Sequence, residues 1–275
     1  MSTARVMANV VLMWDDAITE IAATHIQTHS DETSGFAAEN LLDSDRQTCY
    51  KASNTGDANV VHVRFDLGAI YSIAGFSIHN HNAGTKGVSN ILVKASNDID
   101  EGFTKATYDV STYVGDDDFF HYFDSASSRR YWKIDFQSVD SAGLYIGRIG
   151  LWQSAYQLSR GIMPGSSKGY SHLEDVLTTK GGINHRISRG GLKRHFTGLV
   201  DTSSAAELAE LEALIEHTEV NHKPFCTSWP GGTTSYTGAN IYGAGVHAVI
   251  DAERWEYIMQ VAGRGAPYLP IIEEL

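Results

Sequence analysis

The sequence lacks the features that mark a disulfide-rich secreted protein or a membrane-spanning one. Only two cysteines, Cys49 and Cys226, occur in 275 residues, so there is neither a disulfide framework nor a cysteine cluster for a metal. We expect both to be reduced, separate and buried, with a bridge between them as the less favoured alternative. No stretch approaches the roughly 20 apolar residues of a membrane span. The N-terminus has a short apolar run followed by acids and lacks the h-region and cleavage site of a signal peptide. We therefore expect a protein made in a cytoplasm, without membrane insertion.

Most sequence motifs that directly indicate an enzyme are also missing. There is no Walker loop and no recognisable pair of opposed carboxylates, and the GxSxG match "GSSKG" (165–169) begins in the predicted linker. The stretch "HLED" places His172, Glu174 and Asp175 together, a pattern more typical of a solvated strand edge than of a catalytic site. The sequence predicts a protein that is not an enzyme and needs no cofactor.

Basic residues are outnumbered by acidic ones. The formal net charge is −12, with 21 Lys and Arg against 33 Asp and Glu. An acidic chain is repelled by phosphate backbones, so we expect no nucleic-acid partner. The share of hydrophobic residues is 42%, which is enough for a folded protein with a core.

Short runs rich in valine, isoleucine and aromatic residues fill the first 155 residues, separated by polar turn residues. The clearest run alternates Val61, Val63, Phe65 and Leu67 with polar side chains, as in a strand with one buried face. No segment here shows helical periodicity. The pattern predicts a mainly β fold, a jelly-roll sandwich over residues 1–155.

The composition changes after this region. A Gly/Ser/Pro-containing stretch, residues 156–170, is predicted to be a linker, and 171–275 a second domain. One amphipathic helix is predicted over residues 202–219, with capping-box spacing between Ser204 and Glu207. Its apolar stripe has helical spacing and consists of Leu208, Leu211, Leu214 and Ile215. We expect this part to be a β-barrel or sandwich that carries the helix on its side.

Six stretches in the first region occur in an order typical of one family. They are "AENLLDSDRQTCYKAS" (38–53), "VRFDLG" (63–68), "IAGFSIHNHN" (73–82), "VKASND" (93–98), "RYWKIDF" (130–136) and "IGRIGLW" (146–152). Residues 9–153 thereby resemble the discoidin, or coagulation-factor C-type, domain of the galactose-binding-like superfamily. Tyr50 stands where that family commonly has tryptophan, and we expect it to pack beneath its loop.

The motif "SIHNHN" leaves two interpretations open for His79 and His81. On a strand both rings point to the same side, as a metal site would require. Two histidines supply only half of the four ligands of structural zinc, and no further ligand can be assigned. We therefore favour hydrogen-bonding residues of the sheet or its loop.

The resemblance implies a structural calcium ion in the loop that contains "NLLDSDRQT". Asp43, Asp45 and Thr48 offer oxygen ligands at short spacing, as a hard cation prefers. The alternative is that the two carboxylates only cap a turn. The sequence departs from the family in its last strand, where Arg148 and Gly150 stand and the usual glutamate is missing.

The resemblance also implies carbohydrate binding, in which an aromatic ring stacks on the sugar. The loop aromatics that the sequence offers for such a ligand, or for a protein partner, are Tyr113, Phe119, Phe120 and Tyr122. Many domains of this superfamily bind no sugar and serve as interaction modules.

Residues 160–275 are similar in layout to the β-barrel-plus-helix modules of phage tail tube and distal tail proteins. That similarity implies assembly into a ring, with a hexamer as the expected order. The basic residues Arg189, Lys193 and Arg194 are candidates for subunit contacts. We expect a structural virion protein of a phage tail tip or baseplate, which meets other tail proteins or host-surface glycan. The alternative is a carbohydrate-binding module or adhesin whose main task is glycan recognition.

Overall fold

A computed structural model describes residues 10–43, 48–56, 58–99, 103, 106–109, 115–158, 167–178, 184–199, 205–220, 223, 225–228, 234–237, 240–250, 256–260 and 264–273. The chain divides into two compact units. The sandwich unit comprises Val11–Tyr156 and Phe225–Val246, and the ribbon unit takes in Val10 and the described residues of 157–224 and 247–275. Among the described residues, no helix has the length and apolar character needed to cross a membrane.

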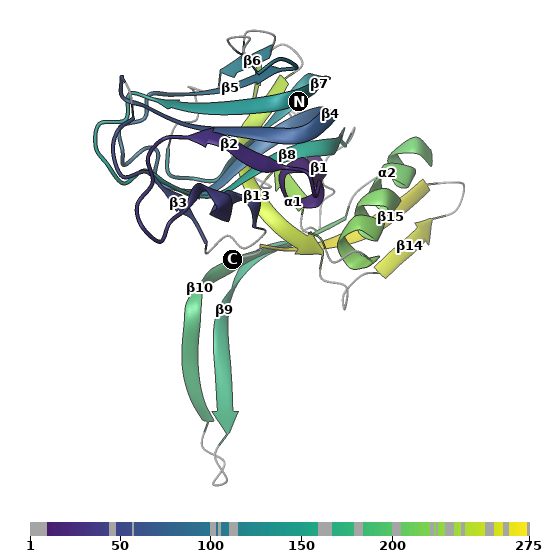
Figure 1. Ribbon diagram of the computed structural model, residues 1–275. Helices are drawn as coiled ribbons and strands as arrows, with labels where there is room; N and C mark the ends of the chain where they lie inside the picture. Colours follow the sequence, from purple (N-terminus) through teal and green to yellow (C-terminus); the bar gives the residue numbers. More distant parts are fainter. Residues whose placement is uncertain are drawn as a thin grey trace, which may run out of the picture. The chain divides into compact units, whose positions relative to one another are not determined.

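The sandwich unit is a mainly β jelly roll (Figure 1). Its strands up to β8 are β1 (Val11–Asp16), β2 (His25–His29), β3 (Tyr50–Lys51), β4 (Val60–His81), β5 (Asn90–Ser96), β6 (Ala106–Asp109), β7 (Phe119–Gln137) and β8 (Tyr145–Gln157). Two short helical turns, α1 (Ala17–Glu20) and the 3-10 turn η1 (Ala38–Leu42), interrupt them. The predicted β-sandwich of the N-terminal half is confirmed.

Two long strands give the sandwich its two layers. The first part of β4 pairs with the last part of β7 and with β2, and β5 and β6 continue this layer beyond β7. The last part of β4 pairs instead with β8, and the first part of β7 joins it there. The register of β4 against β7 shifts between Asp66 and Tyr71 and again between Ile73 and Gly75. At these irregularities each strand passes from one layer to the other.

The core lies between the layers and follows the predicted alternation. Val61, Val63, Phe65 and Leu67 are all fully buried, because alternate side chains of β4 face inward. Burying each contributes about 1.5–3 kcal/mol relative to exposure. Trp132 is also fully buried in this core.

A later segment of the chain completes this unit. Strand β11 (Phe225–Ser228) pairs with β1, and the first part of β13 (Asn240–Ile250) pairs with β12 (Thr234–Thr237) and with the start of β7. Residues 225–246 thus belong to the sandwich unit. The predicted division, with a second domain over residues 171–275, does not include this return of the chain to the first unit. The predicted domain boundaries themselves stay a prediction.

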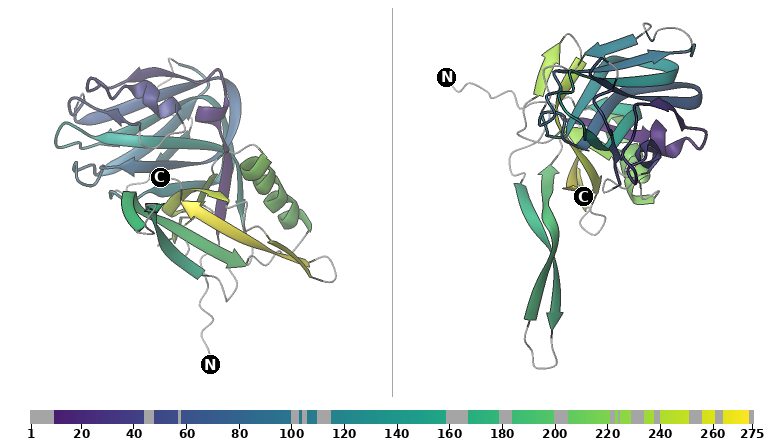
Figure 2. Two further views of the ribbon diagram at one scale, coloured as in Figure 1. Left: turned by 90° about the horizontal axis from the view of Figure 1, so that it is seen from below. Right: turned by 60° about the vertical axis from the view of Figure 1, so that its left-hand side comes forward.

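The ribbon unit contains a long antiparallel pair, β9 (Ser167–Thr178) and β10 (Asn184–Leu199), which Figure 2 shows in two further views. Strand β15 (Arg264–Glu273) pairs with β10, with β14 (Glu256–Gln260) and with the end of β13. The predicted barrel for this region stays a prediction.

The predicted helix is α2 (Ala205–Ile215), followed by a π-helical turn, η3 (Glu216–Val220). Leu211 and Leu214 of the predicted stripe are buried, whereas Leu208 and Ile215 are half-buried. Glu207, expected at the capping position, is also buried. Its predicted partner Ser204 lies outside the described residues.

Candidate functional site

Four loops of the sandwich unit meet at one place. They are residues 31–36, 51–56, 82–87 and 140–144, and we call them the loop cluster. Backbone hydrogen bonds join them: Ser53 N donates to Asp31 O (2.9 Å), Gly143 N to Ala52 O (3.0 Å) and Asp140 N to Lys86 O (2.9 Å). Because neighbouring loops are bonded through their backbones, side chains on them are held at fixed positions.

Phe36 is the exposed aromatic ring of this cluster. It is 38% exposed, and among the residues whose burial the structure describes it is the one aromatic of three large exposed apolar side chains. The Lys51 ammonium lies 5.5 Å from its ring centroid, a cation–π arrangement. Gly35, just before it, has a φ of +85°, which glycine adopts without strain. The turn therefore presents an aromatic surface to solvent beside a positive charge.

Hydrogen-bonding groups lie on the other loops of the cluster. The amide of Asn54 donates to the carboxylate of Asp31 at 2.8 Å, and both residues are exposed. The ammonium of Lys86 donates to Ala142 O at 2.8 Å. The side chain of Asn82 donates to Gly143 O and accepts from Tyr145 N, which locks loop 140–144 to the end of β4. An aromatic surface with polar groups on adjacent loops is the arrangement that saccharide sites use.

Tyr50 lies beneath this surface, as expected from the sequence. Its side chain is fully buried and its hydroxyl donates to Ser30 O at 2.9 Å. Burial, followed by the negative charges of Glu32 and Asp31, raises the pKa of the Tyr50 phenol. The residue therefore supports loop 31–36 as a neutral hydrogen-bonded side chain.

The aromatic residues proposed from sequence lie elsewhere. Phe119 and Phe120 belong to strand β7 and are 2% and 0% exposed, so neither offers a ring to a ligand. Tyr122 also lies on β7 and is partly buried against a small cluster around Phe120. The expectation that these three stand on a loop is corrected: both sides of this part of β7 are covered. Tyr113 lies outside the described residues.

The predicted calcium ligands are described only in part. Asp43 follows η1 and is exposed, Thr48 is half-buried, and Asp45 lies outside the described residues. Asn40 closes the loop by donating to Cys49 O at 2.8 Å. Arg148, in the strand motif that lacks the expected glutamate, is fully buried and its side chain donates to Asp16, so that side chain supplies no oxygen ligand. The calcium ion stays a prediction.

His79 and His81 are hydrogen-bonded residues of the sheet, as favoured from the sequence, but they are buried. His79 Nδ1 lies 3.1 Å from Asp118 Oδ2, and its Nε2 lies 2.8 Å from Ser77 Oγ. His81 Nε2 lies 3.1 Å from Asp117 O. Burial lowers the pKa of His81, although the three aspartates of residues 116–118 oppose this.

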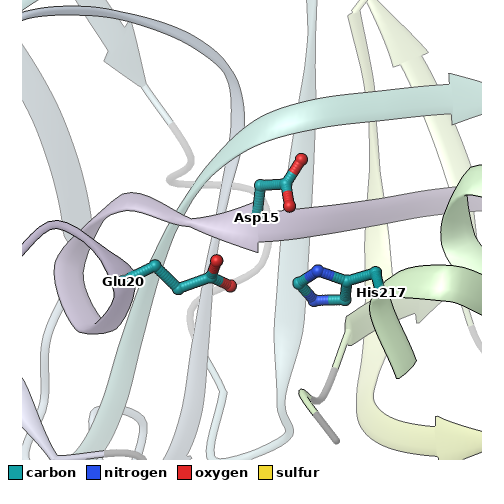
Figure 3. Close-up of side chains that lie close together, drawn as sticks. All are labelled: Asp15, Glu20 and His217. Atoms are coloured by element: carbon teal, nitrogen blue, oxygen red, sulfur yellow. The ribbon is translucent and has the colours of Figure 1, made fainter. Parts of the chain in front are cut away.

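Two acidic side chains lie close together where β1 meets α1 (Figure 3). Carboxylate oxygens of Asp15 and Glu20 lie within 4.8 Å of each other, and the third labelled residue, His217, belongs to the ribbon unit. Both acids already accept hydrogen bonds, Asp15 from Ser154 Oγ (2.6 Å) and Glu20 from Asp16 N (3.0 Å). Within the sandwich unit, each of the two carboxylates therefore already has a hydrogen-bond partner.

The basic residues proposed for subunit contacts lie on β10. Lys193 is paired in register with Ser171 and Arg194 with Tyr170 of β9, while Arg189 falls in the irregular stretch between Ser188 and Leu192. Their role in assembly stays a prediction.

The candidate site residue that the sequence analysis does not single out is Phe36. It lies between the strand motifs, in "SDETSGF", where the clustering of Ser, Asp and Gly indicates only a turn. The sequence feature that could have indicated Phe36 is its position as a single aromatic residue directly after the glycine of a turn.

Comparison with known proteins supports the fold of the first half. Residues 23–150 match the F5/8 type C domain. No match was found among curated proteins. Among solved structures, chitosan-binding module 1 of a chitosanase/glucanase from Paenibacillus sp. IK-5 is 18% identical, with a TM-score of 0.39, over 52% of this chain and 99% of that one. The family 32 carbohydrate-binding module of C. perfringens NanJ, solved with galactose, is 14% identical, with a TM-score of 0.40, over 52% and 98%. The family match identifies residues 23–150 as an F5/8 type C domain, and these residues lie in the β-sandwich described above.

Proposed function

We propose that the F5/8 type C domain of this chain recognises glycans through its loop cluster. The observation that carries the proposal is the exposed ring of Phe36, on a turn bonded to its neighbours and flanked by Lys51. A flat aromatic face stacks on the C–H groups of a sugar ring, and nearby polar groups fix the sugar's orientation. The exposed pair Asp31 and Asn54 and the ammonium of Lys86 are the groups that would select among hydroxyl patterns.

Phe36→Ala is expected to weaken glycan binding about tenfold, because a lost stacking contact of roughly 1–1.5 kcal/mol corresponds to that factor. Binding to a glycan array, followed by titration with the best neutral oligosaccharide, measures it. Ile70→Ala is the matched control, because Ile70 is also exposed, at 58%, and lies on β4 outside the loop cluster. Equal binding by wild type and Phe36→Ala would exclude this ring from the site, and a blank array would exclude the function.

A second candidate function concerns the ribbon unit. We propose that the chain is a structural protein of a phage tail tip or baseplate, made in the host cytoplasm and built into the virion as a ring of six copies. The observation that favours assembly is strand β9, which ends its sheet and pairs, among the described strands, only with β10. A strand edge of 12 residues with free backbone groups can pair with another chain. The loop cluster would then face host-surface glycan or other tail proteins.

The assembly proposal predicts oligomers of defined size. Light scattering on the purified full chain should give a mass that is a multiple of the 30.1 kDa chain, with six copies expected. Val176→Pro, which removes a backbone donor from β9, is expected to reduce the oligomer, because edge strands are blocked by proline. A strict monomer at every concentration would refute this role and would leave glycan recognition standing.

A further inference from the structure

A second surface of the sandwich unit, separate from the loop cluster, carries three cations in one row. Arg64 of β4 lies opposite Lys133 of β7, and Lys133 lies opposite Lys94 of β5. Figure 1 shows these three strands side by side. Because Val63 and Phe65 face the core, Arg64 between them faces outward. We call Arg64, Lys133 and Lys94 the cationic row.

Within the described part of the chain, the three cations of this row are not matched by three carboxylates. A single buried carboxylate, Asp135, lies 2.8 Å from the ammonium groups of both Lys94 and Lys133. Among the described residues, the side chain of Arg64 has no hydrogen-bond or ion-pair partner. Like charges placed directly opposite each other on neighbouring strands are destabilising. The row therefore keeps an excess of positive charge in a chain whose net charge is −12.

Arg64 is held in place by an aromatic ring and not by an acid. Its guanidinium carbon lies 4.4 Å from the ring centroid of Phe103, which is buried and has a φ of +53°. The Nε of Arg64 is buried without a hydrogen-bond partner, and so is the Oε1 of Gln27 on neighbouring β2. Gln27 falls at the irregularity where β2 faces Phe65 and Arg64. A buried donor without a partner is costly, and an acceptor such as a carboxylate oxygen would satisfy the Nε of Arg64.

We propose that the cationic row binds a carboxylate group of an acidic saccharide. The planar guanidinium of Arg64 presents paired donors that match a carboxylate, and its stacking on Phe103 fixes that fork. Lys133 and Lys94, with side chains 23% and 25% exposed, add positive charge beside it. That the ligand is a saccharide rests on the proposed glycan recognition. That it carries an acidic group follows from the positive charges of the cationic row. The domain thus offers two surfaces, a stacking surface at Phe36 and a charged surface at Arg64.

A pair of matched probes tests the proposal: a hyaluronan hexasaccharide and the same oligosaccharide with its carboxyl groups reduced to alcohols. Calorimetric titration of the full chain should show the acidic form binding at least about tenfold more tightly, and the difference should shrink as salt is raised. Arg64→Met keeps an apolar stem against Phe103 and should remove about tenfold of the affinity for the acidic form only. Arg130→Met is the control, because that guanidinium is already bonded to both oxygens of Asp66.

Each outcome bears on the inference. Equal affinity for the two oligosaccharides, no binding of the acidic one at about 1 mM, or full affinity in Arg64→Met overturns it. Loss of neutral-sugar binding in Phe36→Ala, together with any of these, means that the loop cluster is a glycan site and the cationic row is not. Thermal unfolding of Arg64→Met at the wild-type temperature shows that the variant is folded.

Discussion

Arg148→Met should lower the free energy of unfolding of the sandwich unit by about 3–5 kcal/mol, because it leaves a carboxylate buried without its cation. Arg148 and Asp16 are each 1% exposed, and Arg148 Nη2 lies 2.9 Å from Asp16 Oδ2. Asp16 also accepts hydrogen bonds from Leu151 N (3.0 Å) and Ile18 N (3.1 Å), so it joins β1, α1 and β8. Urea unfolding followed by the fluorescence of buried tryptophans measures the change.

The loss should depend on pH in a definite direction. Burial is the largest influence on Asp16 and raises the pKa of its carboxyl, while the charge of Arg148 lowers it in part. Removing Arg148 raises that pKa further. A carboxyl whose pKa is raised by folding contributes stability below its unfolded value, near 3.9, and this contribution is lost as pH rises through the folded value. The difference between Arg148→Met and wild type should therefore be larger at pH 7 than near pH 4.

Two controls separate an unpaired charge from a lost contact. The double variant Asp16→Asn, Arg148→Met leaves no buried charge and should be more stable than Arg148→Met alone. Lys94→Met breaks a partly exposed ion pair whose carboxylate keeps Lys133, so its cost should be below about 1 kcal/mol. A loss in Arg148→Met no larger than that of Lys94→Met would contradict the assignment.

Patterns local in the sequence predicted what local physics decides. The alternation from Val61 to Leu67 identified the core face of β4, because side chains of a strand alternate between faces. The spacing of Leu211 and Leu214 identified the buried side of α2 for the same kind of reason. Contacts between residues far apart in the sequence produce no such local pattern. Asp16 and Arg148 are 132 positions apart, and the residues next to each of them do not indicate that the two form a buried ion pair.

The aromatic run "FFHYF" shows why the proposed ligand residues were misplaced. We expected these rings on a loop, but β7 begins at Phe119. Phe119 packs in the main core, and Phe120 in a second cluster with Trp152 and Met13. A strand buried on both faces carries consecutive apolar residues, a pattern that cannot be distinguished from an aromatic loop by composition alone. The candidate site residue Phe36 was missed because a lone aromatic in a turn has no periodicity.

His79→Leu should lower the free energy of unfolding by about 2–4 kcal/mol, because it removes the centre of a buried hydrogen-bonded chain. Asp118 Oδ2, His79 and Ser77 Oγ follow one another, and Trp152 Nε1 donates to the same Ser77 Oγ at 2.9 Å. Asp118 also accepts from Asn80 N at 2.7 Å, so the chain fixes the end of β4 to the segment before β7. Ser89→Ala is the control and should cost less, because it removes an exposed hydrogen bond to the hydroxyl of Ser138.

The same variant tests whether the histidine motif binds a metal. Both ring nitrogens of His79 lie within hydrogen-bond distance of protein oxygens, at 3.1 and 2.8 Å, and His81 Nδ1 accepts from Ala83 N at 3.3 Å. A zinc ion would have to displace these bonds and find further ligands, since structural zinc takes four. Adding zinc, or a chelator, to the wild type should therefore leave its thermal unfolding unchanged. A rise in unfolding temperature with zinc that disappears in His79→Leu would show that the hydrogen-bonded chain is a metal site, and it would overturn the structural role given to His79.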